Sequence, residues 1–313
     1  MNLDDIHEDL REGFKGNLFF PPIHWPGVLW LGKKLFKIPS QGIVDGVTLI
    51  ERSYGENEVR IYMPDGKISG TGLVILHGGG LIGGDPNMND WNGSWFAKQL
   101  GAIVFSPGYR TAPENPAPAA INDAWAFWHW LQREADGFGV NKDKIVLSGV
   151  SAGGGLATCL THRLSDENSN MPVCLVLTYP MLDDKTATDK SLDDVKHLMW
   201  ANKANRVGWE SYLGANLVGA ASVPDYLVAS RREDLSGLPP TFIGVGDIDL
   251  FYRENIEYAA RLQQAGVHCE TEVLPSAPHG FDYFSKDTEM ITGLRVNMAK
   301  FMSTHLGPVP AND

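Results

Sequence analysis

The feature that most constrains the fold is a set of short runs made up almost entirely of apolar residues, at 73–76, 102–105 and 144–147. Strands of this composition are covered on both faces, as they are in a parallel sheet. Shorter or more mixed runs extend the series on either side. Further strands are therefore predicted at 47–51, 58–63, 173–178, 241–245 and 267–274.

Segments of helical composition lie between these strands and after the last of them. They cover residues 119–133, 152–164, 252–264 and 289–305. Regular alternation of strands and helices predicts an α/β fold, with a mostly parallel central sheet flanked by helices. Ligands bind to such sheets beyond the carboxyl ends of the strands, so functional residues are expected in the loops at that edge.

Two stretches, 1–45 and 183–225, do not follow the alternation, although both contain several aromatic residues. They divide the chain into an N-terminal segment (1–45), a first part of the core (46–182), an insertion (183–225) and a second part of the core (226–313). Each stretch is either a set of peripheral helices packed on the core or a cap over the site. The pattern leaves both interpretations open.

Charge and cysteine content narrow the possible partners. The formal net charge is −12, and an acidic surface repels nucleic acid and anionic membranes. No apolar run reaches the roughly 18 residues that a membrane span needs, and the first residues are acidic where a signal peptide is basic. Cys159, Cys174 and Cys269 are widely spaced and form no CxxC pair, which disfavours disulfides and a zinc site. We therefore expect a cytoplasmic protein.

The sequence Gly149-Val150-Ser151-Ala152-Gly153 matches the GxSxG pattern of a nucleophile elbow. In a chain with 34 glycines the pattern alone is weak, but its position is informative. It follows a predicted buried strand and opens a predicted helix, so the Ser151 hydroxyl is lifted clear of the sheet beside a helix N-terminus. A serine that merely caps the helix is the alternative. Ser151 is the candidate nucleophile.

A second glycine-rich motif, His77-Gly78-Gly79-Gly80, directly follows the strand at 73–76. Consecutive glycines let backbone N–H groups approach a substrate oxygen, as an oxyanion hole for acyl transfer requires. A phosphate-binding loop is the alternative, but a Walker loop needs Lys followed by Ser or Thr, whereas Leu81 and Ile82 follow here. The motif therefore favours an oxyanion hole.

The general base is expected late in the chain, after the acid. His268 lies in a predicted strand and His305 near the end of the last helix, whereas His279 lies in the loop beyond the last strand. His279 is thus the late histidine on the correct edge of the sheet. Asp247 and Asp249 both follow the strand at 241–245, and the pattern does not choose between them.

These motifs together resemble the hormone-sensitive-lipase-like branch of the α/β hydrolases. The resemblance covers residues 46–313 and rests on motifs that occur in the family's order: 77–80, 109–114, 149–153, Asp249-Leu250-Phe251 with Glu254 and Tyr258, and 278–281. It implies an α/β-hydrolase fold with a helical cap built from the N-terminal segment and the insertion. It also implies a catalytic triad and an oxyanion hole, formed by Ser151, Asp249 and His279, and by the N–H groups of Gly79, Gly80 and Ala152.

The resemblance implies a serine carboxylesterase that hydrolyses small or short-chain acyl esters without a metal or an organic cofactor, and a possible homodimer. An amide-directed or specialised deacylase is one alternative, and a non-catalytic ligand receptor on the same fold is another. Val150 departs from the family, which usually has Asp, Glu or Thr at this position of the elbow. The substitution removes a polar contact near the nucleophile.

Overall fold

The central element of the structure, a computed structural model, is a sheet of eight strands in the order β1-β2-β4-β3-β5-β6-β7-β8. The structure describes residues 1–16, 27, 39–66 and 68–307. β1 and β2 form an antiparallel hairpin, β2 is antiparallel to β4, and all other neighbours are parallel. The strands are β1 (Val47–Tyr54), β2 (Asn57–Pro64), β3 (Gly72–Leu76), β4 (Ile103–Pro107), β5 (Ile145–Val150), β6 (Leu175–Thr178), β7 (Thr241–Gly246) and β8 (Cys269–Leu274).

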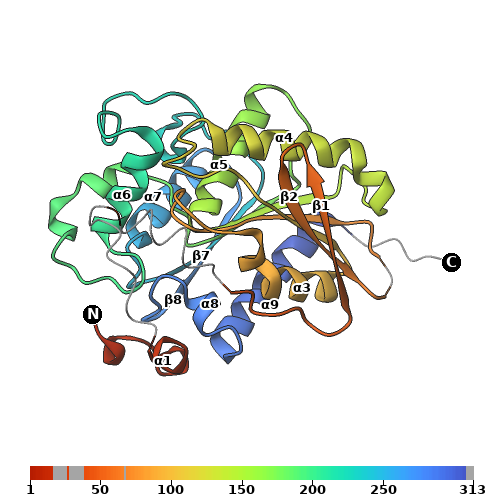
Figure 1. Ribbon diagram of the computed structural model, residues 1–313, viewed down its shortest axis with the longest axis horizontal. Coiled ribbons are helices and arrows are strands. Elements are labelled where there is room, and N and C mark those ends of the chain that lie inside the picture. Colours follow the sequence, from red (N-terminus) through yellow and green to blue (C-terminus); the bar gives the residue numbers. More distant parts are fainter. Residues whose placement is uncertain (17–26, 28–38, 67, 308–313) are drawn as a thin grey trace.

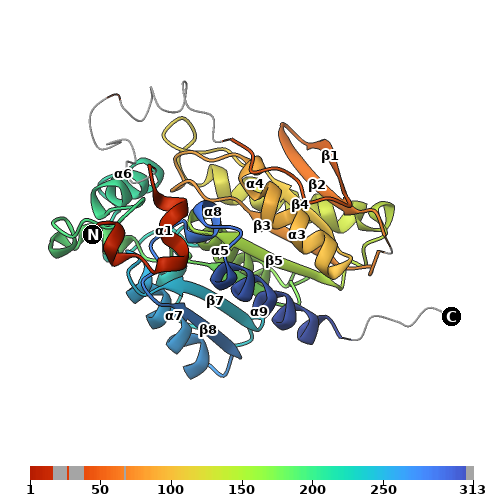
Figure 2. The same cartoon turned by 90° about the horizontal axis from the view of Figure 1, so that it is seen from below.

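Helices cover both faces of this sheet (Figure 1). α4, α5 and α7 pack on one face, and α3 and α9 on the other, where Figure 2 shows them in front of the sheet together with α1 and α8. The helices are α1 (Glu8–Phe14), α3 (Asp90–Leu100), α4 (Ala119–Glu134), α5 (Ala152–Asp166), α6 (Asn202–Leu213), α7 (Tyr252–Gln264), α8 (Phe281–Phe284) and α9 (Glu289–Leu306).

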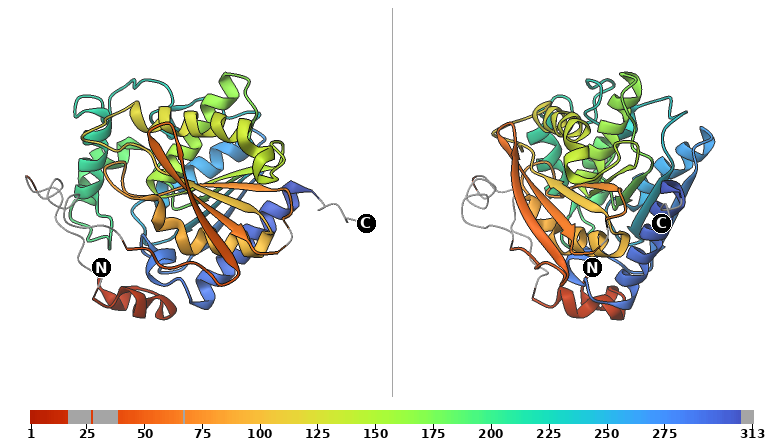
Figure 3. Two further views of the ribbon diagram at one scale, coloured as in Figure 1. Left: turned by 45° about the vertical axis from the view of Figure 1, so that its right-hand side comes forward. Right: turned by 90° about the vertical axis from the view of Figure 1, so that its right-hand side faces the viewer.

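Each face of the sheet has its own hydrophobic cluster, and alternating residues of a strand point into one cluster or the other. In β3, Val74 and Leu76 belong to the cluster under α4 and α5, whereas Leu73 and Ile75 belong to the cluster over α3 and α9. Successive side chains of a strand point to opposite faces, so a strand covered on both sides must be apolar throughout. The predicted mostly parallel sheet flanked by helices is confirmed. Figure 3 shows its twist, from the orange β1–β2 hairpin to β8 in blue.

The predicted strands and helices all occur, with ends that differ by at most three residues. Within the two core parts of the chain, the helices α3 and α8 were not predicted. α3 contains Gly93 and several short polar residues, which are weak helix formers, and its buried Asp90 binds Arg60 and Tyr62. α8 has only four residues. Neither segment shows the apolar periodicity that identifies a helix in a sequence.

The two stretches outside the alternation pack differently. Within the described part of 1–45, α1 lies against α8, where the rings of Phe14 and Phe284 are 5.2 Å apart. The insertion contributes α6, which lies at the carboxyl edge of the sheet. Buried Asp184 anchors its first residues through an ion pair of 2.7 Å with Arg231. Trp25 and Trp30, two of the aromatic residues of this N-terminal segment, lie outside the described residues.

Candidate active site

Ser151 occupies the sharp turn between β5 and α5. Its φ of +54° is unusual for a residue other than glycine. Ser151 is buried, with only 6% of its surface exposed. The turn is possible because its flanks are glycines. A Cβ at Gly149 would lie 2.3 Å from the carbonyl oxygen of Gly153, and one at Gly153 would lie 2.2 Å from that of Leu76. This is the strand–turn–helix context that a nucleophile elbow requires.

The side chains of Ser151, His279 and Asp249 are joined by two consecutive hydrogen-bond contacts. Ser151 Oγ lies 2.9 Å from His279 Nε2, and His279 Nδ1 lies 2.8 Å from Asp249 Oδ2. The other carboxylate oxygen, Asp249 Oδ1, accepts a hydrogen bond of 2.8 Å from the N–H of Phe251. The three residues come from loops after β5, β7 and β8, which end at the same edge of the sheet. The carboxylate therefore has a fixed orientation toward the imidazole.

Aromatic rings hold the imidazole on two sides. The ring of Tyr179 lies 4.4 Å from that of His279, and Phe251 makes an edge contact with it at 5.3 Å. His279 is 9% exposed as a result. Close packing restricts the imidazole to few rotamers. Sequence reasoning missed Tyr179, since it carries no motif and follows β6 in the chain.

The second candidate acid, Asp247, has a different position. Its Oδ1 accepts a hydrogen bond of 2.6 Å from the N–H of Ser276, at the start of the loop that carries His279. Asp247 therefore fastens this loop to the end of β7, and it is Asp249 that contacts the imidazole. The structure thus separates two carboxylates that the sequence pattern left as alternatives.

His268 and His305, which were set aside as the base, lie away from Ser151, and His77 belongs to the glycine motif. His268 precedes β8 at the opposite edge of the sheet, where its ring is 5.5 Å from that of His305. His77 stacks on Tyr109 at 4.1 Å, and burial lowers its pKa to about 4. His77 is therefore uncharged near neutral pH, and it supports the glycine loop.

The glycine loop that carries two of the predicted oxyanion residues approaches the Ser151 turn at Gly78, where an added Cβ would lie 3.5 Å from the Ser151 Cβ. Gly79 and Gly80 have φ values of +122° and +62°, and Ala152 is the first residue of α5, so its N–H has no acceptor within the helix. α6 and Trp200, which precedes it, pack against the glycine loop 77–80. A Cβ at Gly80 would lie 2.3 Å from the Trp200 ring, and one at Gly208 would lie 2.8 Å from the Gly80 carbonyl oxygen.

Comparison with known proteins agrees with this geometry. A family described by the alpha/beta hydrolase fold matches residues 73–283. Esterase LipI from Mycobacterium tuberculosis is 29% identical over 286 residues, which make up 90% of this chain and 83% of LipI. Carboxylesterase NlhH from the same organism is 32% identical over 233 residues, 72% of each chain. The chain belongs to the α/β-hydrolase family, in its hormone-sensitive-lipase-like branch.

A solved structure gives the same result for this α/β hydrolase. A bacterial heroin esterase superposes with a TM-score of 0.85 and 26% sequence identity, over 98% of this chain and 100% of the esterase. Among the described residues of the hydrolase, no group of three or more His, Cys, Asp and Glu side chains could hold a metal ion. Within that same part of the chain, no helix has both the length and the apolar character needed to cross a membrane.

Val150, the unusual residue of the elbow, points away from the nucleophile toward the α3–α9 face of the hydrolase. It packs in the apolar cluster of that face and lines a cavity beside Thr178, Asp282 and Arg295. Val150 supplies no polar group to this cavity, and the carboxylate that lines it belongs to Asp282, three residues after His279. Asp282 accepts hydrogen bonds from the Tyr179 hydroxyl and from Asn92, the latter at 2.8 Å.

Proposed function

We propose that this α/β hydrolase is a serine carboxylesterase that acts on small or short-chain acyl esters, with Ser151, His279 and Asp249 as its catalytic triad. The observation that carries the proposal is the relay of two contacts, 2.9 and 2.8 Å, that joins the serine to the aspartate through the imidazole. A nucleophile, a base and an orienting acid in this arrangement characterise serine hydrolases.

The mechanism is a two-step acyl transfer. His279 accepts the Ser151 proton at Nε2 while Oγ attacks the ester carbonyl, and Asp249 stabilises the imidazolium that forms. The N–H groups of Gly79, Gly80 and Ala152 donate to the carbonyl oxygen as it gains negative charge. The C–O bond to the alcohol then breaks, and the alcohol leaves with the proton from His279. Water repeats the sequence on the acyl-enzyme, with His279 again as the base.

The preference for small acyl groups is supported by the cavity beside the Ser151 turn. It measures about 240 Å³, part of it open to solvent, and Ala152, Leu81, Trp209 and Tyr212 are among its lining residues. The bulky side chains of Trp209 and Tyr212 leave little room in it for a long acyl chain. The names of the relatives, Esterase LipI and Carboxylesterase NlhH, also support ester rather than amide hydrolysis.

The insertion 183–225 is proposed to act as a cap over this cavity, together with the N-terminal segment 1–45. Buried Glu254 of α7 supports this role, because it joins the insertion to the core beside the triad. Its carboxylate accepts hydrogen bonds from the N–H of Leu182, at 2.7 Å, and from the Thr186 hydroxyl. The cap is thus attached to the helix that follows Asp249.

The test compares a short aryl ester with the anilide of the same acid, in the wild type and in Ser151→Ala. We expect hydrolysis of the ester and little of the anilide, with kcat on the ester lower by about 10⁶-fold in the variant because the triad acts as a unit. An acyl phosphonate should add covalently to Ser151 in the wild type, as measured by mass spectrometry. Faster hydrolysis of the anilide would favour the deacylase, and undiminished ester hydrolysis by Ser151→Ala would refute the assignment.

Two further proposals concern the state of the protein in the cell. We propose a homodimer through β8, which is an edge strand of the sheet and carries the exposed Val273. Light scattering of the wild type and of Thr271→Pro, which blocks strand pairing, tests it. We also propose a cytoplasmic location, which the buried and unpaired Cys159, Cys174 and Cys269 support. Cell fractionation tests that proposal.

A further inference from the structure

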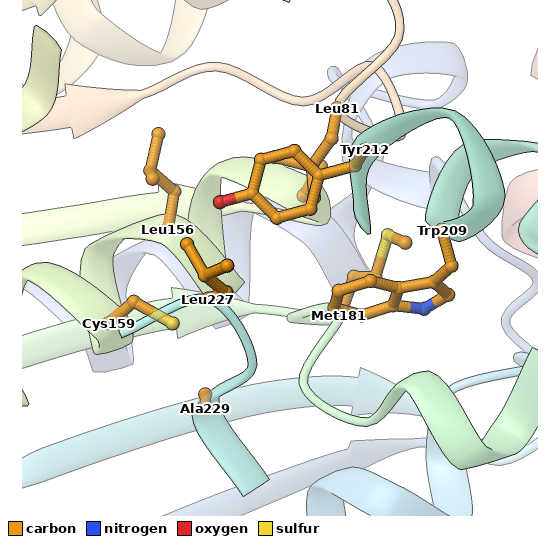
Figure 4. A pocket seen from close by; sticks show the side chains of 10 residues that line it. Leu81, Leu156, Cys159, Met181, Trp209, Tyr212, Leu227 and Ala229 are labelled. Carbon is orange, nitrogen blue, oxygen red and sulfur yellow. The ribbon is translucent and has the colours of Figure 1, made fainter. Parts of the chain in front are cut away.

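Three residues that line the cavity beside the Ser151 turn carry a hydrogen-bond donor that the proposed mechanism does not use: Cys159, Trp209 and Tyr212. Ten residues line the cavity: Leu81, Ala152, Gly155, Leu156, Cys159, Met181, Trp209, Tyr212, Leu227 and Ala229. They come from α5, from α6, and from the segments that follow β3, β6 and the cap insertion. Figure 4 shows the Tyr212 side chain crossing this cavity, with its hydroxyl among the side chains of the opposite wall.

Tyr212 is 2% exposed, and no protein group among the described residues is hydrogen-bonded to its hydroxyl, which stays accessible from the cavity that the residue lines. Buried phenol groups ordinarily find a partner. The other buried tyrosines of this protein follow the rule. Their hydroxyls pair with Gly108 (Tyr54), Asp90 (Tyr62), His77 (Tyr109), Asp282 (Tyr179) and His162 (Tyr258). Tyr212 is thus the exception, and its hydroxyl faces the cavity.

The surroundings of this hydroxyl define what it can bind. No charged side chain lines the cavity. Its other side-chain donors are the indole N–H of Trp209, which is buried and has no hydrogen-bond partner among the described residues, and the Cys159 thiol, whose pKa burial raises to about 12. Burial also raises the pKa of Tyr212 well above its ordinary value, so the phenol remains a neutral donor. A carboxylate would lose its hydration there without a cation in return. A neutral oxygen acceptor on an otherwise apolar group fits the cavity.

The position of the cavity indicates which part of a substrate enters it. Ala152 lines the cavity and supplies one of the proposed oxyanion donors, and Leu81 follows Gly80, which supplies another. A carbonyl bonded to Ser151 Oγ would place its oxygen against these N–H groups. The chain on the acyl side of that carbonyl then starts at the mouth of the cavity.

We infer that the Tyr212 hydroxyl donates a hydrogen bond to a neutral oxygen within the acyl group, so that the enzyme selects short acyl chains with an ether, keto or hydroxyl oxygen over plain alkyl chains. The inference rests on the proposed esterase function and adds a substrate class to it. The hydrogen bond satisfies a donor that the free protein leaves without a partner, which is how a buried polar group produces selectivity.

The test uses pairs of 4-nitrophenyl esters in which an ether oxygen replaces one methylene group: methoxyacetate with butanoate, and 3-methoxypropanoate with pentanoate. The measured quantity is the ratio of kcat/KM for the ether ester to that for the alkyl ester. Comparing this ratio between wild type and Tyr212→Phe cancels the intrinsic reactivity of the esters. We expect the ratio to fall by about 5- to 10-fold in Tyr212→Phe for at least one pair, which is the effect of one hydrogen bond.

Tyr258→Phe is the matched control, since it also removes a buried hydroxyl but one that does not line the cavity. Its ratio should equal that of the wild type even if its absolute rates fall. An unchanged ratio in Tyr212→Phe for both pairs would overturn the inference. So would an effect of Tyr212→Phe that appears only when the ether oxygen is moved to the alcohol, as in 2-methoxyethyl acetate against butyl acetate.

A binding measurement separates this inference from the proposed function. In the Ser151→Ala background, the four esters are titrated against tryptophan fluorescence, because Trp209 lines the cavity. Tyr212→Phe should weaken binding of the ether ester relative to the alkyl ester by the same factor. If the wild type hydrolyses none of the esters, the esterase proposal fails. Independently of that outcome, the role of Tyr212 is refuted if the ratio of Kd for the ether ester to Kd for the alkyl ester is the same with and without the Tyr212 hydroxyl.

Discussion

The ring of Tyr179 lies against the imidazole of His279, with centroids 4.4 Å apart, while its hydroxyl donates to the carboxylate of Asp282. One side chain therefore packs on the proposed base and also binds the first turn of α8, which begins two residues after that base. Asp282 in turn accepts from Asn92 of α3, and Arg295 of α9 donates to Asn92 at 2.8 Å. A buried network thus fixes the loop that carries His279.

We expect the two functions of Tyr179 to be separable. Tyr179→Phe keeps the ring but deprives buried Asp282 of a donor, which should lower the free energy of unfolding by about 1–3 kcal/mol. Its kcat should fall less than 10-fold. Tyr179→Leu also removes the ring face that orients the imidazole, so kcat should fall by about 10²-fold. Urea unfolding and kcat on one aryl ester measure both effects, and equal kcat values for the two variants would contradict the role of the ring.

The choice between the two acids is tested by paired substitutions. Asp249→Asn preserves size but can hold the imidazole in the wrong tautomer, so kcat should fall by about 10⁴-fold with little loss of stability. Asp247→Asn weakens the hydrogen bond to the Ser276 N–H, which should lower the melting temperature and change kcat much less. If Asp247→Asn is the less active variant at equal stability, the acid is misassigned.

The contact between α6 and the oxyanion loop is expected to be sensitive to one methyl group. A Cβ at Gly208 would lie 2.8 Å from the Gly80 carbonyl oxygen, so Gly208→Ala must move α6 or the loop. A displacement of the donors of this size should lower kcat/KM by 10-fold or more, up to about 10²-fold. Gly293→Ala is the control, because nothing lies within 4 Å of its Cβ position in α9. Alanine there should leave activity unchanged and stabilise the helix by up to about 1 kcal/mol.

Two buried histidines, His77 and His162, are expected to make the free energy of unfolding depend on pH. Burial lowers the pKa of His77 to about 4 and that of His162 to about 3, from 6.5. The unfolded chain therefore binds protons that the folded protein does not, and stability present above about pH 6.5 is lost as the pH falls toward 4. Each histidine should contribute a loss of about 2 kcal/mol between pH 7 and pH 5.

The measurement is urea unfolding at both pH values for the wild type, His162→Gln and Tyr258→Phe. His162→Gln should reduce the difference in unfolding free energy between pH 7 and pH 5 by about 2 kcal/mol. Tyr258→Phe breaks the 2.9 Å hydrogen bond to His162 but keeps the titrating group, so its difference should remain close to that of the wild type. An undiminished difference in His162→Gln would show that His162 does not contribute.

The sequence alone determined the architecture and the edge of the sheet at which the site lies. Runs such as 73–76 and 144–147 are apolar on both faces, and only a strand between two helical layers requires that. The glycines around Ser151 are equally informative, since the turn has no room for a Cβ at Gly149 or Gly153. Local composition and backbone geometry are properties that a sequence records directly.

Tertiary structure decided which groups meet across long stretches of chain. Asp247 and Asp249 are two residues apart and equivalent as a pattern, and only the path of the His279 loop brings one carboxylate within 2.8 Å of the imidazole. Tyr179 and Asp282 carry no motif, and they pair because β6 ends beside α8. The orientation of Tyr212 depends likewise on the packing of α6 over α5. Such contacts are set by the mutual placement of elements that are distant in sequence, to which neither residue type nor spacing along the chain is a guide.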